Sequence, residues 1–204
     1  MKQLILASQS PRRSEILKKA GYQFVPFPVH VSEIPDKNLN QNEQILDIAG
    51  RKAAAVCSEI RDKGLVFRDA VVLTADTMVC LDAAVLGKPE SEVQSRAFLR
   101  ALSGKSHQVK TALCLIDLTN LEKTTHIETT HVFFRHLSDD EISAYIATGE
   151  PLDKAGAYAI QGFGGKFVER FEGDFNNVVG LPLHALENIF KMNSWDFQKT
   201  QTDL

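Results

Sequence analysis

The sequence lacks several features that would assign it quickly to a known class. The chain has no net positive charge, since 23 Lys and Arg against 26 Asp and Glu leave a formal net charge of −3. A basic surface over the whole chain is therefore excluded, and we expect no nucleic-acid partner, although a local basic pocket stays open. No apolar run approaches the roughly 18 residues of a membrane span, so we expect no membrane partner.

Cysteine is scarce, and the chain has no linker rich in Pro, Gly or Ser. Cys57, Cys80 and Cys114 form no C-x-x-C pair, which predicts reduced thiols in a cytoplasmic protein. A length of 204 residues favours one domain, or one domain split into two lobes. We take residues 1–192 as that domain, and residues 193–204 as a polar tail that frays unless Trp195 and Phe197 dock.

Apolar runs and helical periodicities alternate along the chain, which predicts an α/β protein with a mixed sheet. A hairpin in the middle of the chain accounts for the antiparallel part of that sheet. A glycine-rich, aromatic stretch over 156–171 predicts further strand segments around a loop. We expect strands over 4–7, 71–81, 107–117 and 124–135, and helices over 11–20, 42–61, 91–102, 138–149 and 182–192.

The first candidate site lies where the first strand passes into the first helix, at Ser8-Gln9-Ser10-Pro11-Arg12-Arg13. Ser10 is a good N-cap, and Pro11 suits the first helical position. One interpretation is a capped helix with two solvated arginines. The other is a phosphate site, because consecutive cations oppose the helix dipole and a bound anion would offset that penalty.

The second candidate is an acidic residue within an apolar strand, in Thr74-Ala75-Asp76-Thr77. A buried carboxylate is costly unless a cation or a metal pairs with it. Asp76 therefore lies at an exposed strand end, or it holds a metal or a water. Lys52 stands alone on a largely apolar helix, where a snorkelling surface lysine is the simplest interpretation.

Two further segments present polar groups in turns. Leu86-Gly87-Lys88-Pro89 aims one lysine, which alone is a weak indication because turn lysines are usually solvated. The segment from Asp153 to Gly162 mixes charged, small and amide groups and suits a close approach of backbone to a ligand.

Other motifs fail on spacing. Gly162, Gly164, Gly165 and Lys166 do not give G-x-x-x-x-G-K-[ST], and Phe167 stands where the hydroxyl residue must be. Neither H-E-x-x-H nor G-x-S-x-G occurs. We interpret the histidines as ordinary core or surface residues.

Taken together, these segments resemble the Maf family of nucleoside triphosphate pyrophosphatases, the septum-formation proteins. The matching segments occur in the same order as in the family, from Leu4 to about Leu186. Each segment alone is weak, and the match is specific because all of them occur in that order. The matching segments are Leu6-Ala7-Ser8-Gln9-Ser10-Pro11-Arg12-Arg13, Ala75-Asp76-Thr77, Leu86-Gly87-Lys88-Pro89, Leu102-Ser103-Gly104-Lys105-Ser106-His107, Thr148-Gly149-Glu150, Asp153 to Gly162, and Asn177-Val178-Val179-Gly180-Leu181-Pro182-Leu183.

The resemblance implies a two-lobed, inosine triphosphatase-like fold with a nucleotide-binding cleft. It implies hydrolysis of a nucleoside triphosphate to a monophosphate and pyrophosphate, with Mg²⁺ or Mn²⁺ as cofactor. Asp76 matches the family's proton acceptor. Glu33 matches a loop glutamate that is a metal or catalytic-water partner in the family. The resemblance thus implies Asp76 and Glu33 as the candidate metal ligands. The candidate phosphate ligands are Ser8, Arg12, Arg13, Lys52 and Lys88. Lys154, within the D-K-A-G motif, is a further candidate to face the substrate.

The resemblance also bears on the base that is bound. One branch of the family, acting on dTTP and UTP, carries Thr and Gln where this chain has Thr77 and Gln161. Ala159 and Phe175 stand where the family often shows Gly and Tyr, which could reshape the base pocket. Modified pyrimidine nucleotides as substrates, a non-catalytic nucleotide-binding regulator of cell division, and a homodimer are the alternatives left open.

Overall fold

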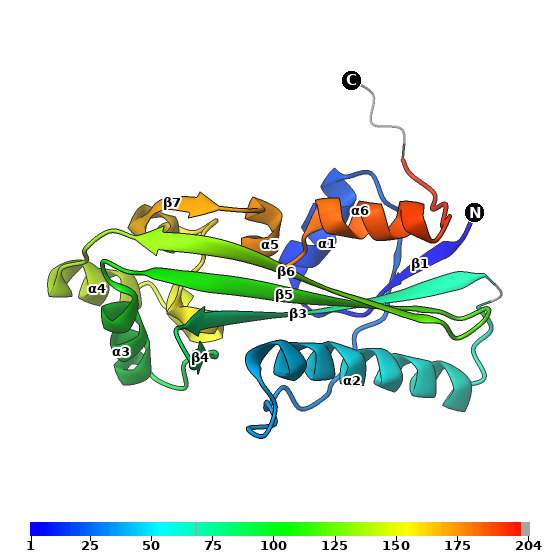
Figure 1. Ribbon diagram of the computed structural model, residues 1–204, viewed down its shortest axis with the longest axis horizontal. Coiled ribbons are helices and arrows are strands. Elements are labelled where there is room, and N and C mark those ends of the chain that lie inside the picture. Colours follow the sequence, from blue (N-terminus) through cyan, green and yellow to red (C-terminus); the bar gives the residue numbers. More distant parts are fainter. Residues whose placement is uncertain (68, 201–204) are drawn as a thin grey trace. The chain divides into compact units, whose positions relative to one another are not determined.

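The computed structural model describes residues 1–67 and 69–200. Helices and strands alternate along the chain as expected (Figure 1). The strands are β1 (Gln3–Leu6), β2 (Val25–Pro26), β3 (Ala70–Leu81), β4 (Ala84–Leu86), β5 (Ser106–Asp117), β6 (Lys123–Phe134) and β7 (Val168–Glu172). The α-helices are α1 (Pro11–Lys19), α2 (Gln41–Asp62), α3 (Glu92–Leu102), α4 (Asp139–Ile146), α5 (Phe175–Val179) and α6 (Leu183–Met192).

The described strands form one mixed sheet of seven strands, which confirms the predicted α/β class. Their order is β2-β1-β3-β5-β6-β7, with β4 paired to β3. β1 runs parallel to both of its neighbours, whereas β3–β4 and β6–β7 are antiparallel. β2 contains a proline and occupies the edge beside β1, the place in a sheet that tolerates a missing N–H.

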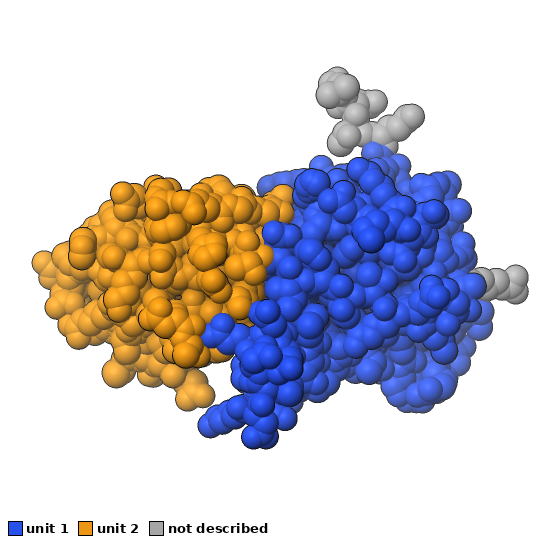
Figure 2. Space-filling model, viewed as in Figure 1, with its two compact units in different colours: residues 1–76, 111–128, 180–204 blue, residues 77–110, 129–179 orange. Residues whose placement is uncertain are grey.

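The chain divides into two compact units (Figure 2). Unit 1 comprises residues 1–76, 111–128 and 180–204, and unit 2 comprises residues 77–110 and 129–179. Each unit has its own apolar cluster, with Ile5, Val56 and Val72 in unit 1 and Leu99, Val132 and Phe134 in unit 2. The strands β3, β5 and β6 each contribute residues to both units.

In unit 1, α2 lies on one face of the strands, and α1 and α6 lie on the other (Figure 1). α2 begins at a capping box in which Asn40 accepts from the Glu43 N–H, and the Glu43 carboxylate accepts from the Asn40 N–H. Residues after α6 dock on this unit through Trp195 and Phe197, which was the alternative to the expected fraying of the tail. Trp195 donates to the Asp117 carboxylate at 3.1 Å, and Phe197 is 5% exposed.

Unit 2 contains the main departures from the sequence-based expectation. Most of the stretch 156–171 is not strand. It forms 3₁₀ turns at Ala155–Ala157 and Phe163–Phe167, and within this stretch only the residues of β7 pair as a strand. Gly156 has φ +68° and packs against Val79 so closely that a Cβ would lie 2.8 Å from Val79 Cγ1. The turns therefore follow from tertiary packing, which the sequence pattern does not display. The short elements β4 and α5 were not predicted.

Candidate active site

The loop between β1 and α1 is held by Arg13, the third residue of that helix. Arg13 donates through Nε to the Gly180 carbonyl at 2.7 Å and through a terminal nitrogen to Ser8 Oγ at 3.2 Å. Ser8 Oγ also accepts from the Ser10 N–H at 3.2 Å. Arg13 is therefore an anchored guanidinium and not a solvated side chain.

The start of α1 differs in one detail from the sequence-based expectation. Ser10 occupies the N-cap position and Pro11 the first helical position, but the Ser10 hydroxyl makes no capping hydrogen bond. The first turn holds no acidic side chain, and its charged residues are the cations Arg12 and Arg13. Amide N–H groups at a helix start, with two guanidinium groups beside them, form a setting that favours an anion.

One face of β3 turns its polar side chains toward α2. Thr74 donates to the Ala49 carbonyl at 2.8 Å and to the Cys114 carbonyl at 3.2 Å. Asp76 lies two residues further along β3, on the same face, and accepts from Lys52 Nζ at 2.7 Å. Asp76 and Lys52 are each 8% exposed. The expectations of an exposed Asp76 and of a snorkelling Lys52 are therefore wrong, and the Asp76 carboxylate is compensated by the ammonium group of Lys52.

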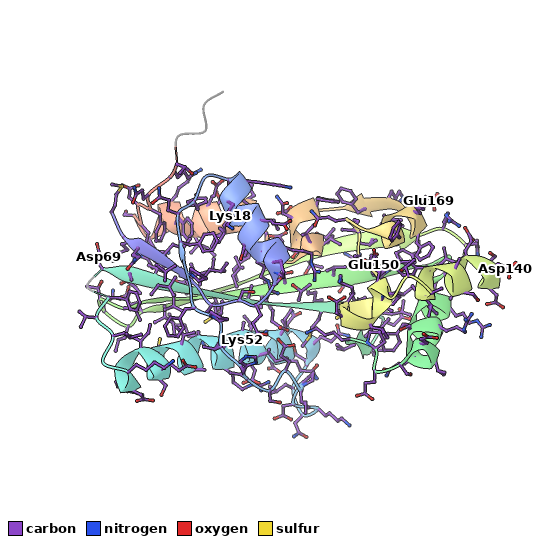
Figure 3. The ribbon with its side chains drawn as sticks, turned by 180° about the vertical axis from the view of Figure 1, so that it is seen from behind. Lys18, Lys52, Asp69, Asp140, Glu150 and Glu169 are labelled. Atoms are coloured by element: carbon purple, nitrogen blue, oxygen red, sulfur yellow. The ribbon has the colours of Figure 1, made fainter. Side chains whose placement is uncertain are left out.

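A third charged group completes this cluster in unit 1. The Glu33 carboxylate lies 2.6 Å from Lys52 Nζ. Its loop is fixed by Arg51, one residue before Lys52 on α2, which donates to the carbonyls of Ser32 and Ile34 on either side of Glu33. Lys52, labelled in Figure 3, thus holds two carboxylates that come from distant parts of the chain.

Burial governs the protonation of these groups. It raises the pKa of Asp76 above its ordinary value, although the charges of Lys52 and Arg13 oppose that rise. It also lowers the pKa of the Arg13 guanidinium, against the attraction of Asp76 and Glu33. A carboxyl group with a raised pKa, held by a lysine, suits a proton acceptor that works near neutral pH.

The donor set of this cluster fits a hard divalent cation bound together with substrate. Within residues 1–67 and 69–200, no group of three or more His, Cys, Asp or Glu side chains is placed to hold a metal ion. Glu33 and Asp76 nevertheless offer two carboxylates, and Mg²⁺ commonly takes only one or two carboxylates beside substrate phosphates. The 46% exposed side chain of Glu33 is open to such an ion.

The remaining predicted site residues belong to unit 2. Thr77 lies on β3, Lys88 follows β4, and Lys154 and Gln161 lie in the turns before β7. The Gly156 N–H donates to the Gly87 carbonyl at 3.1 Å, which brings the turns of Lys88 and Lys154 together. Lys154 forms an ion pair with Asp153, and Gln161 is exposed.

Several residues of these surroundings were missed by sequence reasoning. The Gly180 carbonyl and Arg51 orient Arg13 and Glu33, and in unit 2 Glu150 and Tyr145 organise the loop of Gln161. Gly180 and Glu150 stand within motifs that the sequence match included, but neither motif indicates what the residue contacts. Arg51 had no signal beyond its place next to Lys52.

Comparison with known proteins agrees with this geometry. The family model described as Maf-like protein matches residues 3–193. The chain belongs to this family, which confirms the resemblance inferred from the sequence motifs.

Its relatives are similar over nearly their whole length. A protein of Bdellovibrio bacteriovorus named dTTP/UTP pyrophosphatase is 54% identical over 91% of this chain and 96% of its own. Proteins of the same name from Caldicellulosiruptor bescii and Bacillus velezensis are 44% and 46% identical, over 98% and 89% of this chain and 98% and 92% of theirs. Among the described residues, no helix is both long and apolar enough to cross a membrane.

Proposed function

We propose that this protein hydrolyses nucleoside triphosphates, with dTTP and UTP as preferred substrates, to the monophosphate and pyrophosphate. The observation that carries the proposal is the buried pair of Lys52 and Asp76, 2.7 Å apart, with the part-exposed Glu33 carboxylate 2.6 Å from the same Lys52 Nζ. A buried ion pair of this kind contributes little to stability, so a catalytic use is the better explanation. The similarity to dTTP/UTP pyrophosphatases supports it.

The cations bind the triphosphate in this proposal. Arg13 presents a guanidinium fixed by Gly180 and Ser8, and Arg12 stands beside it at the start of the same helix. A planar guanidinium suits two phosphate oxygens at once. Ser8, Lys52 and Lys88 are the further phosphate ligands in this proposal, and Lys154 is a further residue that faces the substrate.

Asp76 is the proton acceptor. It takes a proton from water as the water oxygen attacks the α-phosphorus. The bond from that phosphorus to the bridging oxygen breaks, and pyrophosphate leaves with its charge spread over the same cations. Lys52 keeps Asp76 oriented toward the water, and its ammonium group offsets the charge that accumulates on the phosphoryl oxygens.

A divalent cation, Mg²⁺ or Mn²⁺, is the cofactor we propose. Glu33 and Asp76 would hold it, and when bound it polarises the phosphoryl group that is attacked. Before substrate binds, the single positive charge of Lys52 offsets part of the negative charge of the two carboxylates.

The base is selected by residues of unit 2. The amide of Gln161 can donate and accept, as the edge of a uracil or thymine ring requires. Thr77 is the second specificity residue. We expect the double replacement of Thr77 and Gln161 by Ala to shift base preference away from dTTP and UTP, with little change in the inhibition constant for pyrophosphate. An unchanged preference would contradict this assignment.

The proposed reaction is tested by assaying a panel of nucleoside triphosphates, with Mg²⁺ or Mn²⁺, for pyrophosphate and monophosphate release. We expect the fastest release from dTTP and UTP, and loss of release when the metal is chelated. Including modified pyrimidine triphosphates shows whether they exceed the common ones. Thermal stabilisation by dTTP without release of pyrophosphate from any nucleotide would contradict hydrolysis and favour a nucleotide-binding regulator.

We also propose a cytoplasmic location, since the thiols of Cys57, Cys80 and Cys114 are free and nucleotides are the substrates. A single functional domain over residues 1–192 stays a prediction, as does a homodimer. Size-exclusion chromatography with light scattering tests the dimer.

A further inference from the structure

The carboxylate of Glu150 lies at the centre of the loop that carries Gln161. Glu150 Oε1 accepts from Tyr145 Oη at 2.8 Å and from the Gly164 N–H at 3.1 Å. Its Oε2 accepts from the Phe163 N–H at 3.0 Å. One side chain thus binds a hydroxyl of α4 and the backbone amides two and three residues after Gln161.

Tyr145 holds the other side of the same loop. Its hydroxyl oxygen accepts from the Ala159 N–H at 3.3 Å, two residues before Gln161. The Tyr145 ring is 4% exposed and packs edge-to-face on Phe167 at 4.9 Å. Burial, together with the nearby Glu150 carboxylate, raises the pKa of Tyr145, so its hydroxyl stays protonated and donates to Glu150.

The loop follows Glu150 closely, as its glycines show. A Cβ at Gly162 would lie 2.2 Å from Glu150 Oε2, and a Cβ at Gly164 would lie 2.8 Å from Tyr145 Oη. Only glycine permits this approach at either position. The glycines on both sides of Phe163 are therefore explained by contact with the two side chains and not by flexibility.

We infer that Glu150, supported by Tyr145, is a positioning residue that fixes the exposed Gln161 amide for recognition of the pyrimidine base. The inference rests on the proposed function of Gln161. Hydrogen bonds hold the backbone amides of Ala159, Phe163 and Gly164, which lie on both sides of Gln161. The backbone of Gln161 therefore has few accessible conformations. Pre-organised supporting contacts of this kind sharpen recognition.

The test compares Glu150→Gln with Glu169→Gln, an exposed glutamate on β7 of the same unit (both labelled in Figure 3). A glutamine has the same size but only one acceptor oxygen, and its NH₂ group would face donors. We expect Glu150→Gln to lower the dTTP-to-dATP ratio of kcat/KM about tenfold, as the loss of about one hydrogen bond to a charged group would. In Glu150→Gln, the lower kcat/KM for dTTP should come mainly from a higher KM, and kcat/KM for dATP should change little. In Glu169→Gln, kcat/KM should change little for both nucleotides.

Two further variants separate positioning from general stability. Tyr145→Phe keeps the carboxylate and should lower the same ratio by a smaller factor, even if Glu150→Gln folds poorly. In a Gln161→Ala background, Glu150→Gln should change the ratio no further. An equal loss for dTTP and dATP, an unchanged ratio, or a full effect in the Gln161→Ala background would overturn the inference.

The failure of this inference differs from failure of the proposed function. If the unaltered protein prefers dTTP and Gln161→Ala abolishes that preference while Glu150→Gln does not, only the role of Glu150 is wrong. If the unaltered protein releases no pyrophosphate, or if Gln161→Ala leaves the preference intact, the proposed function of Gln161 is wrong and the role of Glu150 is rejected with it.

Discussion

The two units differ in the kind of polar group that each one buries. Among the described residues, the fully buried ionised side chains, Lys52, Asp76 and Asp117, all belong to unit 1. The fully buried polar side chains of unit 2, Ser95, His107, Thr130 and Asn177, carry no charge when His107 is neutral. A buried charge needs a specific use or full compensation. Unit 1 therefore buries charged side chains, whereas unit 2 buries neutral ones. We propose that proton transfer takes place in unit 1 and that hydrogen bonds of unit 2 select the base.

The two buried aspartates of unit 1 show how use and compensation differ. Asp117 accepts from the Trp195 ring at 3.1 Å, the Thr119 N–H at 2.9 Å and Lys2 at 3.2 Å, so its oxygens are satisfied by structural donors. Asp76 is paired with Lys52, whose ammonium group Glu33 shares. The two buried aspartates thus differ in their partners, a difference that the sequence alone does not show.

The largest effect is expected from Asp76→Asn. Losing the proton acceptor should lower kcat for dTTP by roughly 10²–10⁴-fold. The binding of dTTP should persist, because the cations that bind phosphate remain. Stopped-time assays of pyrophosphate and calorimetric titration with dTTP measure the two effects. Asp69→Asn, at an exposed aspartate of the same unit, is the matched control and should leave kcat nearly unchanged. Activity of Asp76→Asn near the normal rate would place the chemistry elsewhere.

A second effect, on the pH dependence of stability, is expected from the buried His107 of unit 2. His107 is 3% exposed, its Nε2 lies 2.8 Å from Tyr158 Oη, and burial lowers the pKa of His107 to about 4. The unfolded chain binds this proton at a higher pH than the folded chain. The resulting stability is therefore full above about pH 6.5 and declines as the pH falls toward 4, by about 3 kcal/mol in all.

Urea unfolding between pH 7 and pH 4 measures this loss, and hydrogen exchange assigns it to unit 2. His107→Gln can keep a hydrogen bond to Tyr158 but does not titrate, so its stability should decline less over the same range. Equal slopes for the two proteins, or an early loss of protection confined to unit 1, would contradict the role of His107.

A smaller effect is expected when Arg13 is replaced by Lys. A lysine cannot bind the Gly180 carbonyl and Ser8 in the same arrangement while presenting a fork to phosphate. KM for dTTP should rise about tenfold, the loss of about one charge-assisted hydrogen bond, with a smaller change in kcat. Lys18→Ala, at an exposed cation of the same helix, is the control. Steady-state kinetics measure KM for both variants. Equal KM values for Arg13→Lys and Lys18→Ala would show that Arg13 only stabilises the loop.

Sequence reasoning found the long elements and the ordered motifs, because those depend on local patterns. The apolar runs of β3 and β5 and the periodicity of α2 lie within one or two residues of their expected limits. The turns after Lys154 could not be predicted, since Gly156 adopts its conformation through packing on Val79 from a distant segment.

The candidate site was predicted in the same uneven way. Asp76 was singled out because a carboxylate in an apolar strand requires an explanation. Its partner could not be identified, because the contact between Lys52 and Asp76 spans 24 positions and depends on how α2 packs on β3. Glu150 escaped notice for a similar reason, since its ligands are backbone amides that any residue type can supply.

The central claim is tested most directly by one set of steady-state measurements with dTTP and dATP on Asp76→Asn and Gln161→Ala. We expect Asp76→Asn to lower kcat for both nucleotides by the same large factor and to leave their order of preference intact. We expect Gln161→Ala to lower kcat/KM for dTTP alone and to keep kcat for dATP. If Gln161→Ala lowered kcat equally for both nucleotides, or if Asp76→Asn altered preference without a large loss of rate, the division of work between the two units would be contradicted.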